Sequence, residues 1–344
     1  MIKKGLLIIV GLIAVLLISL IILLNTGPSL PPEADAAIKE AMQSKVPELV
    51  TGNTGYSKNG DVDIWYEYRD PVTPSKGSIL LIAGALSSAM LWPDYLIEPF
   101  VSAGYQVIRY DHRGLGMSNW LADWNKDNPY TLEHMAKDAI AVLDALEVNK
   151  AHVIGVSMGG MIAQRMAISH ADRILSLTSI SSSGYMEDPE LLDQTKDLRL
   201  DFLRLFLKYG ISQSEEDTIK LTVGFIQLLM AEGADDLDFK DIAENVLYET
   251  RKRRGYNPKI WDQHTTAISL SGSRYQELPT IGVPTLIIHG TADQAIPISH
   301  AKIYAELIPD AKTLWLEGVG HIIPKTYNNQ VIEAVLNNIK NSAG

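Results

Sequence analysis

Cysteine is absent from the 344-residue chain, which excludes disulfide bonds, thiol catalysis and cysteine-ligated metal. The lack of cysteine leaves the redox compartment open. Positive charge is also scarce, because 30 Lys and Arg face 41 Asp and Glu, for a formal net charge of -11. The dense basic run is RKRRG at residues 251–255. Since phosphate binding draws on clustered positive charge, we expect no nucleic-acid partner.

Charged residues are missing altogether from residues 5–24, GLLIIVGLIAVLLISLIILL, which follow Lys3 and Lys4. At about 1.5 Å per residue, such a helix spans about 30 Å, the thickness of a bilayer's hydrocarbon core. A cleaved signal peptide has a shorter apolar core and a small-residue cleavage site, and the following NTGPSLPP has no A-x-A pattern. We therefore expect residues 1–24 to form an N-terminal signal-anchor transmembrane helix.

The position of the two lysines predicts the orientation of this segment. Positive charge before the span keeps the N-terminus cytoplasmic, which predicts a single-pass membrane protein whose folded domain is extracytoplasmic. The alternative is a protein that is secreted after signal cleavage.

The rest of the chain divides into a tether, a core and an insertion. With 46% hydrophobic residues, the chain can bury a substantial core. Residues 25–54 are interpreted as a tether, proline-rich at first and then with helical spacing. We assign residues 55–183 and 273–344 to the core. Residues 184–272 are assigned to a helical cap, because they have helical periodicity and no strand-like runs.

Strand-like and helix-like segments alternate through the core. A hairpin is predicted at Asn59–Gly60, which lie between two β-prone runs. Buried strands are predicted at 77–84, 105–111, 152–156, 174–181, 284–290 and 313–318, and helices at 134–146, 159–170 and 331–339. This alternation is typical of a mostly parallel central sheet with helices on both faces. The carboxyl ends of such strands share one edge, where ligands bind.

The stretch GVSMG places Ser157 between glycines, after a predicted strand and before a predicted helix. A nucleophilic serine needs this context, since it sits on a sharp, strained turn whose neighbours must be small. Gly155 and Gly159 supply that room. The alternative is a serine in a purely structural turn. We interpret Ser157 as the nucleophile.

A serine becomes a good nucleophile when a base takes its proton and a carboxylate holds that base in the right tautomer. In this type of fold the expected chain order is serine, then acid, then histidine. Asp293 follows the strand in LIIHGTADQAIP, and His321 lies in LEGVGHIIP after the next strand. Both fall on the predicted edge of Ser157, so Ser157, Asp293 and His321 form the predicted catalytic triad.

A tetrahedral intermediate also needs two backbone N–H donors. The predicted oxyanion hole consists of the amide of Met158, directly after the nucleophile, and that of Ala85, with Leu86 as the alternative. Leu86, Trp92 and His264 are candidate substrate-binding residues. Trp92 has an alternative role in packing under the cap, and His264 could reach down from the cap into the pocket.

Three other histidines are given structural roles. His289 is expected to pack or to bond backbone, and His112 in DHRGLGMS to shape a tight loop through local hydrogen bonds. His300 is expected to face solvent from a helix.

These motifs together resemble the α/β-hydrolase fold, from about residue 55 to the C-terminus. The matching stretches are DHRGLGMS, VIGVSMGGMIAQ, VPTLIIHGTADQAIP and LEGVGHIIP. Many members carry His-Gly at the oxyanion loop, where this chain has Ala83-Gly84. That substitution, with ALSSAMLWP and QHTTAISLSGSR, is similar to the aclacinomycin methylesterase-like branch. Dehalogenases and epoxide hydrolases of this fold use an aspartate nucleophile, so Ser157 argues against them.

The triad and the resemblance predict a serine hydrolase that cleaves a carboxylic ester through an acyl-enzyme intermediate, with no cofactor and no metal. An apolar pocket under the cap would favour a small hydrophobic ester substrate. One alternative is thioester, lactone or C–C bond hydrolysis, or acyl transfer, by the same triad. Another is a catalytically silent hydrolase-like receptor for a small hydrophobic ligand. Natural substrate, acyl-chain preference and oligomeric state do not follow from the sequence.

Overall fold

The computed structural model describes residues 27–191, 196–212, 214–230 and 237–341, together with Gly11, Leu12 and Val15. The predicted anchor at residues 1–24 therefore lies almost entirely outside the described residues. Within the described ranges, no helix is both long enough and apolar enough to cross a bilayer.

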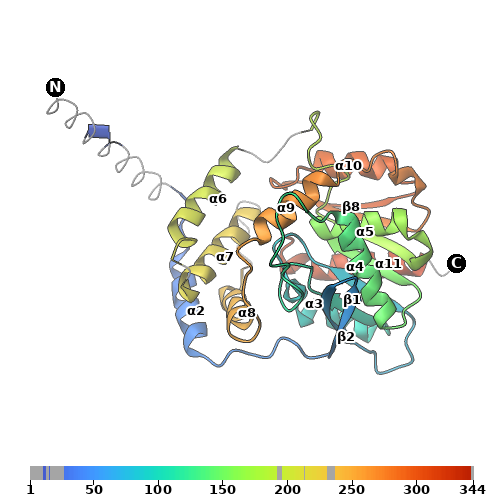
Figure 1. Cartoon of the computed structure of the whole chain (residues 1–344), viewed down its shortest axis with the longest axis horizontal. Helices are drawn as coiled ribbons and strands as arrows, with labels where there is room; N and C mark the ends of the chain where they lie inside the picture. The colour runs from blue at the N-terminus through green and yellow to red at the C-terminus, as the bar shows by residue number, and fades with distance from the viewer. Residues whose placement is uncertain are drawn as a thin grey trace.

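An eight-stranded sheet in the order β1-β2-β4-β3-β5-β6-β7-β8 forms the centre of the fold (Figure 1). The strands are β1 (Asn53–Asn59), β2 (Val62–Arg69), β3 (Ser78–Ile82), β4 (Gln106–Tyr110), β5 (Ala151–Val156), β6 (Ile174–Ile180), β7 (Thr285–Gly290) and β8 (Lys312–Leu316). β1 and β2 form the predicted hairpin, in which Asn59 pairs with Val62 and Gly60 takes a φ of 61°. β2 is antiparallel to β4, and the remaining pairs are parallel.

Helices cover both faces of the sheet, as the apolar strands require. One face packs against α4 (Leu132–Ala145), α5 (Met158–Ser169) and α10 (Ile298–Leu307). The other face packs against α3 (Asp94–Ser102) and α11 (Asn328–Lys340). Each predicted strand and helix of the core is therefore confirmed, with ends that move by a few residues.

A group of helices lies between β6 and β7, inside the range predicted as a cap. These cap helices are α6 (Lys196–Tyr209), α7 (Glu215–Leu229), α8 (Phe239–Arg251) and α9 (Ile260–Leu270). They follow the carboxyl end of β6, which puts them at the sheet edge where Ser157 lies.

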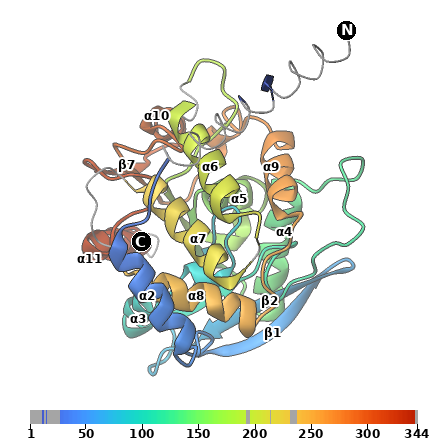
Figure 2. The same ribbon diagram turned by 90° about the vertical axis from the view of Figure 1, so that its left-hand side faces the viewer.

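The tether contributes a helix of its own, α2 (Pro32–Gln43), which begins with proline at its first turn. Its buried residues Ile38 and Ala41 pack against Ile219 of α7 and Val246 of α8. In Figures 1 and 2, α2, α6, α7 and α8 lie together on one side of the sheet. Helix α2 is thus packed against the cap helices.

Candidate functional site

Ser157 occupies a strained turn between β5 and α5, with φ 54° and ψ −122°. Such a conformation is costly for a residue with a side chain and persists where the surroundings hold it. Glycines make the turn possible: a Cβ on Gly155 would collide with the backbone of Gly159 and Gly160, and a Cβ on Gly159 with the carbonyl of Ile82. The predicted strand–serine–helix context is therefore present.

Asp293 and His321 meet in the loops that follow β7 and β8. His321 Nδ1 donates to Asp293 Oδ2 at 2.8 Å, and Asp293 Oδ1 accepts from the amides of Ala295 and Ile296, each at 2.8 Å. His289 Nε2 lies 3.2 Å from the same Oδ2 and 2.8 Å from the carbonyl oxygen of Ile296. The carboxylate is thus fixed by four neighbours, and sequence reasoning assigned His289 its backbone bond and missed its contact with the acid.

The environment of Asp293 favours its ionised form. Burial raises the pKa of the Asp293 carboxyl, but the His321 imidazole and the hydrogen bonds from His289 and His321 outweigh that cost and bring the pKa well below its usual range. An ionised Asp293 that accepts from Nδ1 keeps the other nitrogen of His321, Nε2, available as a base.

The loop after β3 lies against Ser157. A Cβ on Gly84 would come within 3.4 Å of Ser157 Cβ and 4.0 Å of Ser157 Oγ. Met158 opens α5, so its amide is one of the first-turn donors that have no acceptor within the helix. The Leu86 amide donates to His264 Nδ1 at 3.0 Å. Of the two donors predicted from the loop, Leu86 is therefore already engaged, which favours Ala85.

Two histidines hold this loop at its ends. His112 Nε2 lies 2.9 Å from the carbonyl oxygen of Ala83, so it donates there, and His264 Nδ1 accepts from Leu86. The two rings meet edge to face with centroids 5.6 Å apart. His264 belongs to α9, so a cap residue positions the loop. Neither contact was predicted: His264 was a candidate substrate-binding residue that could reach into the pocket, and His112 was expected to shape its own loop through local hydrogen bonds.

Both histidines are neutral at pH 7. Burial lowers the pKa of His112 to about 4. Burial, and then the neighbouring His112, lower the pKa of His264 well below its usual value. A neutral His264 is what the bond from Leu86 requires, because a protonated ring has no acceptor.

A buried ion cluster ties the cap to the same region. Arg253, just past α8, pairs with Asp111 and with Glu249, and Ser88 donates to Glu249. Asp111 Oδ1 in turn accepts from the Ala89 amide at 2.9 Å. Leu86 and Ser88 are therefore held by hydrogen bonds to the cap residues His264 and Glu249. Ala89 is held by Asp111, which in turn pairs with Arg253 just past the end of α8.

Trp92 and Leu86 are the remaining substrate-binding candidates. Trp92 is 7% exposed and packs with the cluster on the α3 and α11 face of the sheet. Leu86 is half-buried, with φ 64°. The expectation for His300 is wrong, because His300 is buried on α10 and its Nδ1 lies 3.0 Å from Ser183 Oγ. The side of α10 that carries His300 packs onto the protein, and the sequence pattern around His300 did not reveal which side that would be.

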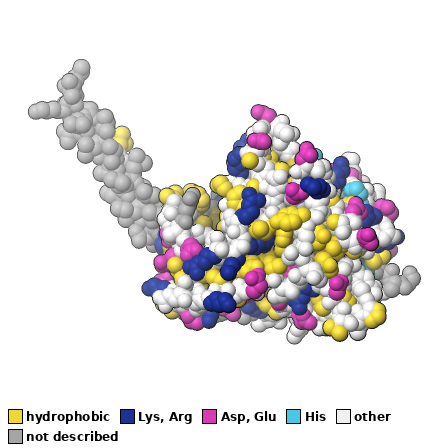
Figure 3. All heavy atoms as spheres, turned by 60° about the horizontal axis from the view of Figure 1, so that its bottom comes forward, with side chains coloured by type: hydrophobic (Ala, Val, Ile, Leu, Met, Phe, Trp, Pro, Cys, Tyr) yellow, Lys and Arg dark blue, Asp and Glu magenta, His cyan; other side chains and the backbone are white. Residues whose placement is uncertain are grey.

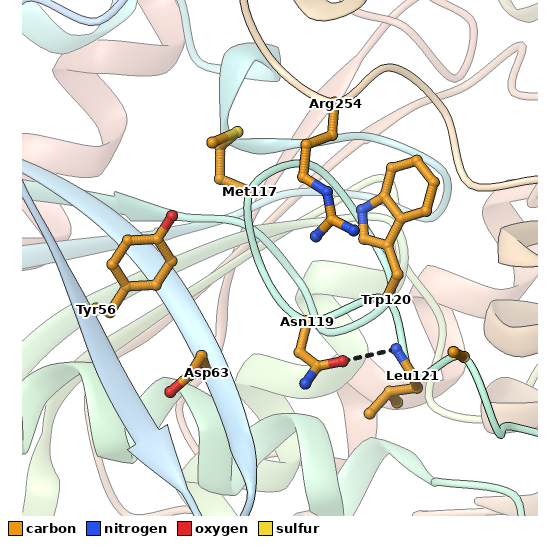
Figure 4. Close-up of a pocket in the computed structure, with 8 residues that line it drawn as sticks. Tyr56, Asp63, Met117, Asn119, Trp120, Leu121 and Arg254 are labelled. Atoms are coloured by element: carbon orange, nitrogen blue, oxygen red, sulfur yellow. Dashed lines mark hydrogen bonds between the residues drawn. The ribbon is translucent and has the colours of Figure 1, made fainter.

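An open cavity of about 330 Å³ lies at the β1–β2 edge (Figure 4). Trp120 and Arg254 line it together, with the guanidinium 4.4 Å from the ring centroid. The cavity contains none of the predicted triad residues. Among the residues that the structure describes, no group of His, Asp or Glu side chains is arranged to hold a metal ion.

Replacing His264 with phenylalanine keeps a ring of similar size and removes the acceptor for the Leu86 amide. Without this bond the loop that carries the Ala85 amide would shift, and a displaced oxyanion donor weakens transition-state binding. We therefore expect kcat to fall about 10- to 100-fold with a smaller change in KM. His264→Asn, whose Oδ1 can accept, should recover part of the loss, and Thr265→Ala, exposed on the same helix, should have no effect. A rise in KM with an unchanged kcat would instead support the substrate-contact role.

The two neutral histidines predict that acid destabilises the fold. In the unfolded chain a histidine has a pKa of about 6.5, whereas His112 titrates at about 4 in the fold. Between these values the unfolded chain binds the extra proton, so the free energy of unfolding falls as the pH drops, by about 1.4 kcal/mol per pH unit for each such histidine. Urea midpoints between pH 7 and 4.5 measure this slope. His112→Gln should flatten it and His170→Gln should not, and equal slopes in both variants would contradict the assignment.

Comparison with known proteins agrees with this architecture. The profile of the family described as alpha/beta hydrolase fold matches residues 77–326. The chain is 30% identical to the rhodomycin D methylesterase of Streptomyces peucetius over 292 residues, 80% of this chain and 95% of that protein. It is 27% identical to a putative carbamate hydrolase of Azorhizobium caulinodans, over 80% of this chain and 96% of that protein.

Solved structures share the fold at lower identity. An esterase from Exiguobacterium antarcticum aligns with a TM-score of 0.65 and 20% identity, over 83% of this chain and 98% of that one. A membrane phospholipase A aligns with a TM-score of 0.63 and 21% identity, over 98% and 99% of the two chains. The sheet order, the strained serine turn and these matches lead to one conclusion: the chain belongs to the α/β-hydrolase family of enzymes.

Proposed function

We propose that this protein hydrolyses a carboxylic ester, with Ser157 as nucleophile, His321 as general base and acid, and Asp293 as the group that orients His321. The observation that carries the proposal is the 2.8 Å bond between His321 Nδ1 and Asp293 Oδ2, on the sheet edge where Ser157 occupies its strained turn. Ser157 follows β5, Asp293 lies in the loop after β7 and His321 in the loop after β8, which is the chain order that the fold uses for its triad.

In the first half-reaction, Ser157 Oγ attacks the ester carbonyl carbon while His321 Nε2 takes the hydroxyl proton. The amides of Met158 and Ala85 donate to the oxyanion that forms. When the intermediate collapses, the C–O bond breaks and the alcohol leaves with the proton from His321. In the second half-reaction, His321 removes a proton from water, which attacks the acyl-Ser157, and the carboxylic acid leaves as the Ser157 hydroxyl is restored.

Support for an ester substrate comes from the curated relatives. Two rhodomycin D methylesterases match most of the chain at 30% and 31% identity. The carbamate hydrolases among the matches are described as putative and are less similar, at 27% and 26%. We propose a small hydrophobic ester, since the cap helices lie at the edge where the substrate would bind.

The test is a substrate panel on the purified full chain. p-Nitrophenyl esters of increasing chain length and simple methyl esters are compared with a thioester, a lactone and a carbamate. We expect kcat/KM to be highest for an ester. Equal or faster turnover of a lactone or thioester would replace the ester assignment with another acyl chemistry, and absence of any turnover by folded protein would favour the ligand receptor.

For residues 5–24 we propose a membrane anchor, with Lys3 and Lys4 on the cytoplasmic side and the hydrolase domain outside. The proposal rests on the uncharged length of the run and on the lysines that precede it. The full chain in cell membranes should resist extraction by alkaline carbonate and should have the mass of the uncleaved sequence. A shorter mature chain in the soluble fraction would establish signal cleavage and secretion instead.

A further inference from the structure

The cap helix α6 has an apolar outer face. Leu200, Leu203 and Phe206 recur every three residues and are 36%, 48% and 51% exposed. Ile211, just past the end of the helix, is 66% exposed. Residues three or four apart lie on the same side of a helix, so Leu200, Leu203 and Phe206 extend along one surface of α6. These three side chains and the exposed Ile211 that follows the helix are here called the α6 stripe.

The α6 stripe is not the face by which α6 packs onto the protein. Leu205 is buried against Gly224 of α7, and the rings of Phe202 and Phe225 meet edge to face at 5.2 Å. A surface helix normally carries polar residues opposite its packed side. Apolar residues on that outer side indicate contact with another apolar phase.

The continuous described range that starts at Gly27 begins beside this helix. Gly27 lies against Arg204 of α6, close enough that a Cβ on Gly27 would be 2.7 Å from Arg204 Cδ. Leu24, the last residue of the uncharged run, precedes Gly27 by three residues. Even a fully extended chain spans only about 11 Å over that distance. The carboxyl end of the run is therefore within about 11 Å of Gly27, which itself lies against Arg204 in α6.

We propose that the α6 stripe lies in the headgroup and acyl boundary of the bilayer that holds the anchor. This inference rests on the anchor proposed above and not on the ester chemistry. Because the tether is so short, an anchored chain cannot carry α6 away from the membrane surface. Figure 3 shows hydrophobic side chains gathered on the surface next to the N-terminal end of the described chain.

The residues at the end of α6 suit such an interface. Lys208 is exposed, and its Nζ lies 5.1 Å from the centroid of the Tyr209 ring. Tyrosine and lysine are typical of the headgroup level, where an apolar body and a polar tip are both accommodated. Apolar residues of an interfacial helix enter about 5–10 Å into the boundary. The cap, and with it the sheet edge of Ser157, then faces the bilayer, which gives a hydrophobic ester a short path from the lipid.

The absence of native cysteine allows a direct test in the full chain. Phe206→Cys is labelled with an environment-sensitive fluorophore and reconstituted into vesicles of phosphatidylcholine and phosphatidylglycerol, with and without nitroxide-labelled lipid. Val72→Cys is the matched control, because Val72 is fully exposed in the loop between β2 and β3, at the opposite sheet edge from the cap. Flotation of the vesicles reports the anchor independently, and p-nitrophenyl ester turnover reports the fold.

With the chain floating, we expect nitroxide lipid to quench the label at 206 about two-fold and to leave the label at 72 unchanged. A label at Leu200→Cys should be quenched to the same extent. Adding L203S and F206S to the Leu200→Cys protein should abolish this quenching while ester turnover stays unchanged. A floating chain whose label at 206 stays solvated overturns the proposal. A label at 206 that is shielded from water but not quenched by nitroxide lipid also overturns it and would indicate contact with a second copy of the chain. A chain that does not float with the vesicles overturns both this proposal and the anchor.

Discussion

Ser157→Ala is expected to abolish turnover, with a loss of about 10⁵- to 10⁶-fold in kcat for the ester that the wild type prefers. The methyl group of alanine cannot attack a carbonyl, and a water molecule held by His321 is a poorer substitute. Binding should survive, since the oxyanion donors and the cap remain. Initial rates and a ligand titration on both proteins measure the two effects separately.

The control for this variant is Ser169→Ala, an exposed serine at the end of α5 on the same helix. It should retain wild-type kcat and KM. Alanine at 157 has the same strained φ to adopt, so the fold should be kept, and circular dichroism checks this. A Ser157→Ala enzyme that keeps even a tenth of the activity contradicts the nucleophile assignment.

Asp293→Asn is expected to lower kcat about 10⁴-fold with little change in KM. The amide has nearly the shape of the carboxylate, but its NH₂ group can donate to His321 Nδ1. The ring then carries its proton on Nε2, toward Ser157, and cannot accept the hydroxyl proton. The ionised state of Asp293, held by His321 and His289, is lost as well.

The matched control is Asp310→Asn, because Asp310 is exposed in a turn with φ 54°, which asparagine tolerates. It should change neither kinetics nor stability. A drop in kcat of less than about ten-fold for Asp293→Asn would mean that a group other than Asp293 orients His321.

The sheet could be predicted from sequence because its strands are short apolar runs bounded by glycine and proline. β3 is buried at all five positions, so periodicity and composition agreed there. Ser157, Asp293 and His321 could be proposed from sequence because Ser157 directly follows β5 and the other two lie in the loops after β7 and β8. The carboxyl ends of parallel strands lie at one edge of a sheet, so a common location can be predicted without knowledge of side-chain packing.

Contacts between the cap and the core could not be predicted in this way. His264 and Leu86 are 178 residues apart, and their bond depends on how α9 docks onto the loop after β3. Nothing in the local sequence of either residue specifies that docking. The same holds for Arg253, which belongs to the basic run RKRRG and yet is buried against Asp111 and Glu249.

Helix α2 shows a different limit. Its helical spacing was visible in the tether, but a chain segment with an apolar stripe does not say which surface it will cover. The structure places Ile38 among α7 and α8 residues, so the tether is part of the cap side. Its acidic outer residues complete the contact, since Glu40 pairs with Lys240 at 2.6 Å and Asp35 with Lys220 at 3.2 Å.

If Ser157 is an activated nucleophile, a fluorophosphonate should label the full chain covalently at this residue. Wild type, Ser157→Ala and Ser169→Ala are incubated with the probe, and intact mass and peptide mapping locate the adduct. We expect one adduct, on Ser157, in wild type and Ser169→Ala, and none in Ser157→Ala. A folded wild type that takes up no probe, or an adduct on another serine, would contradict this expectation.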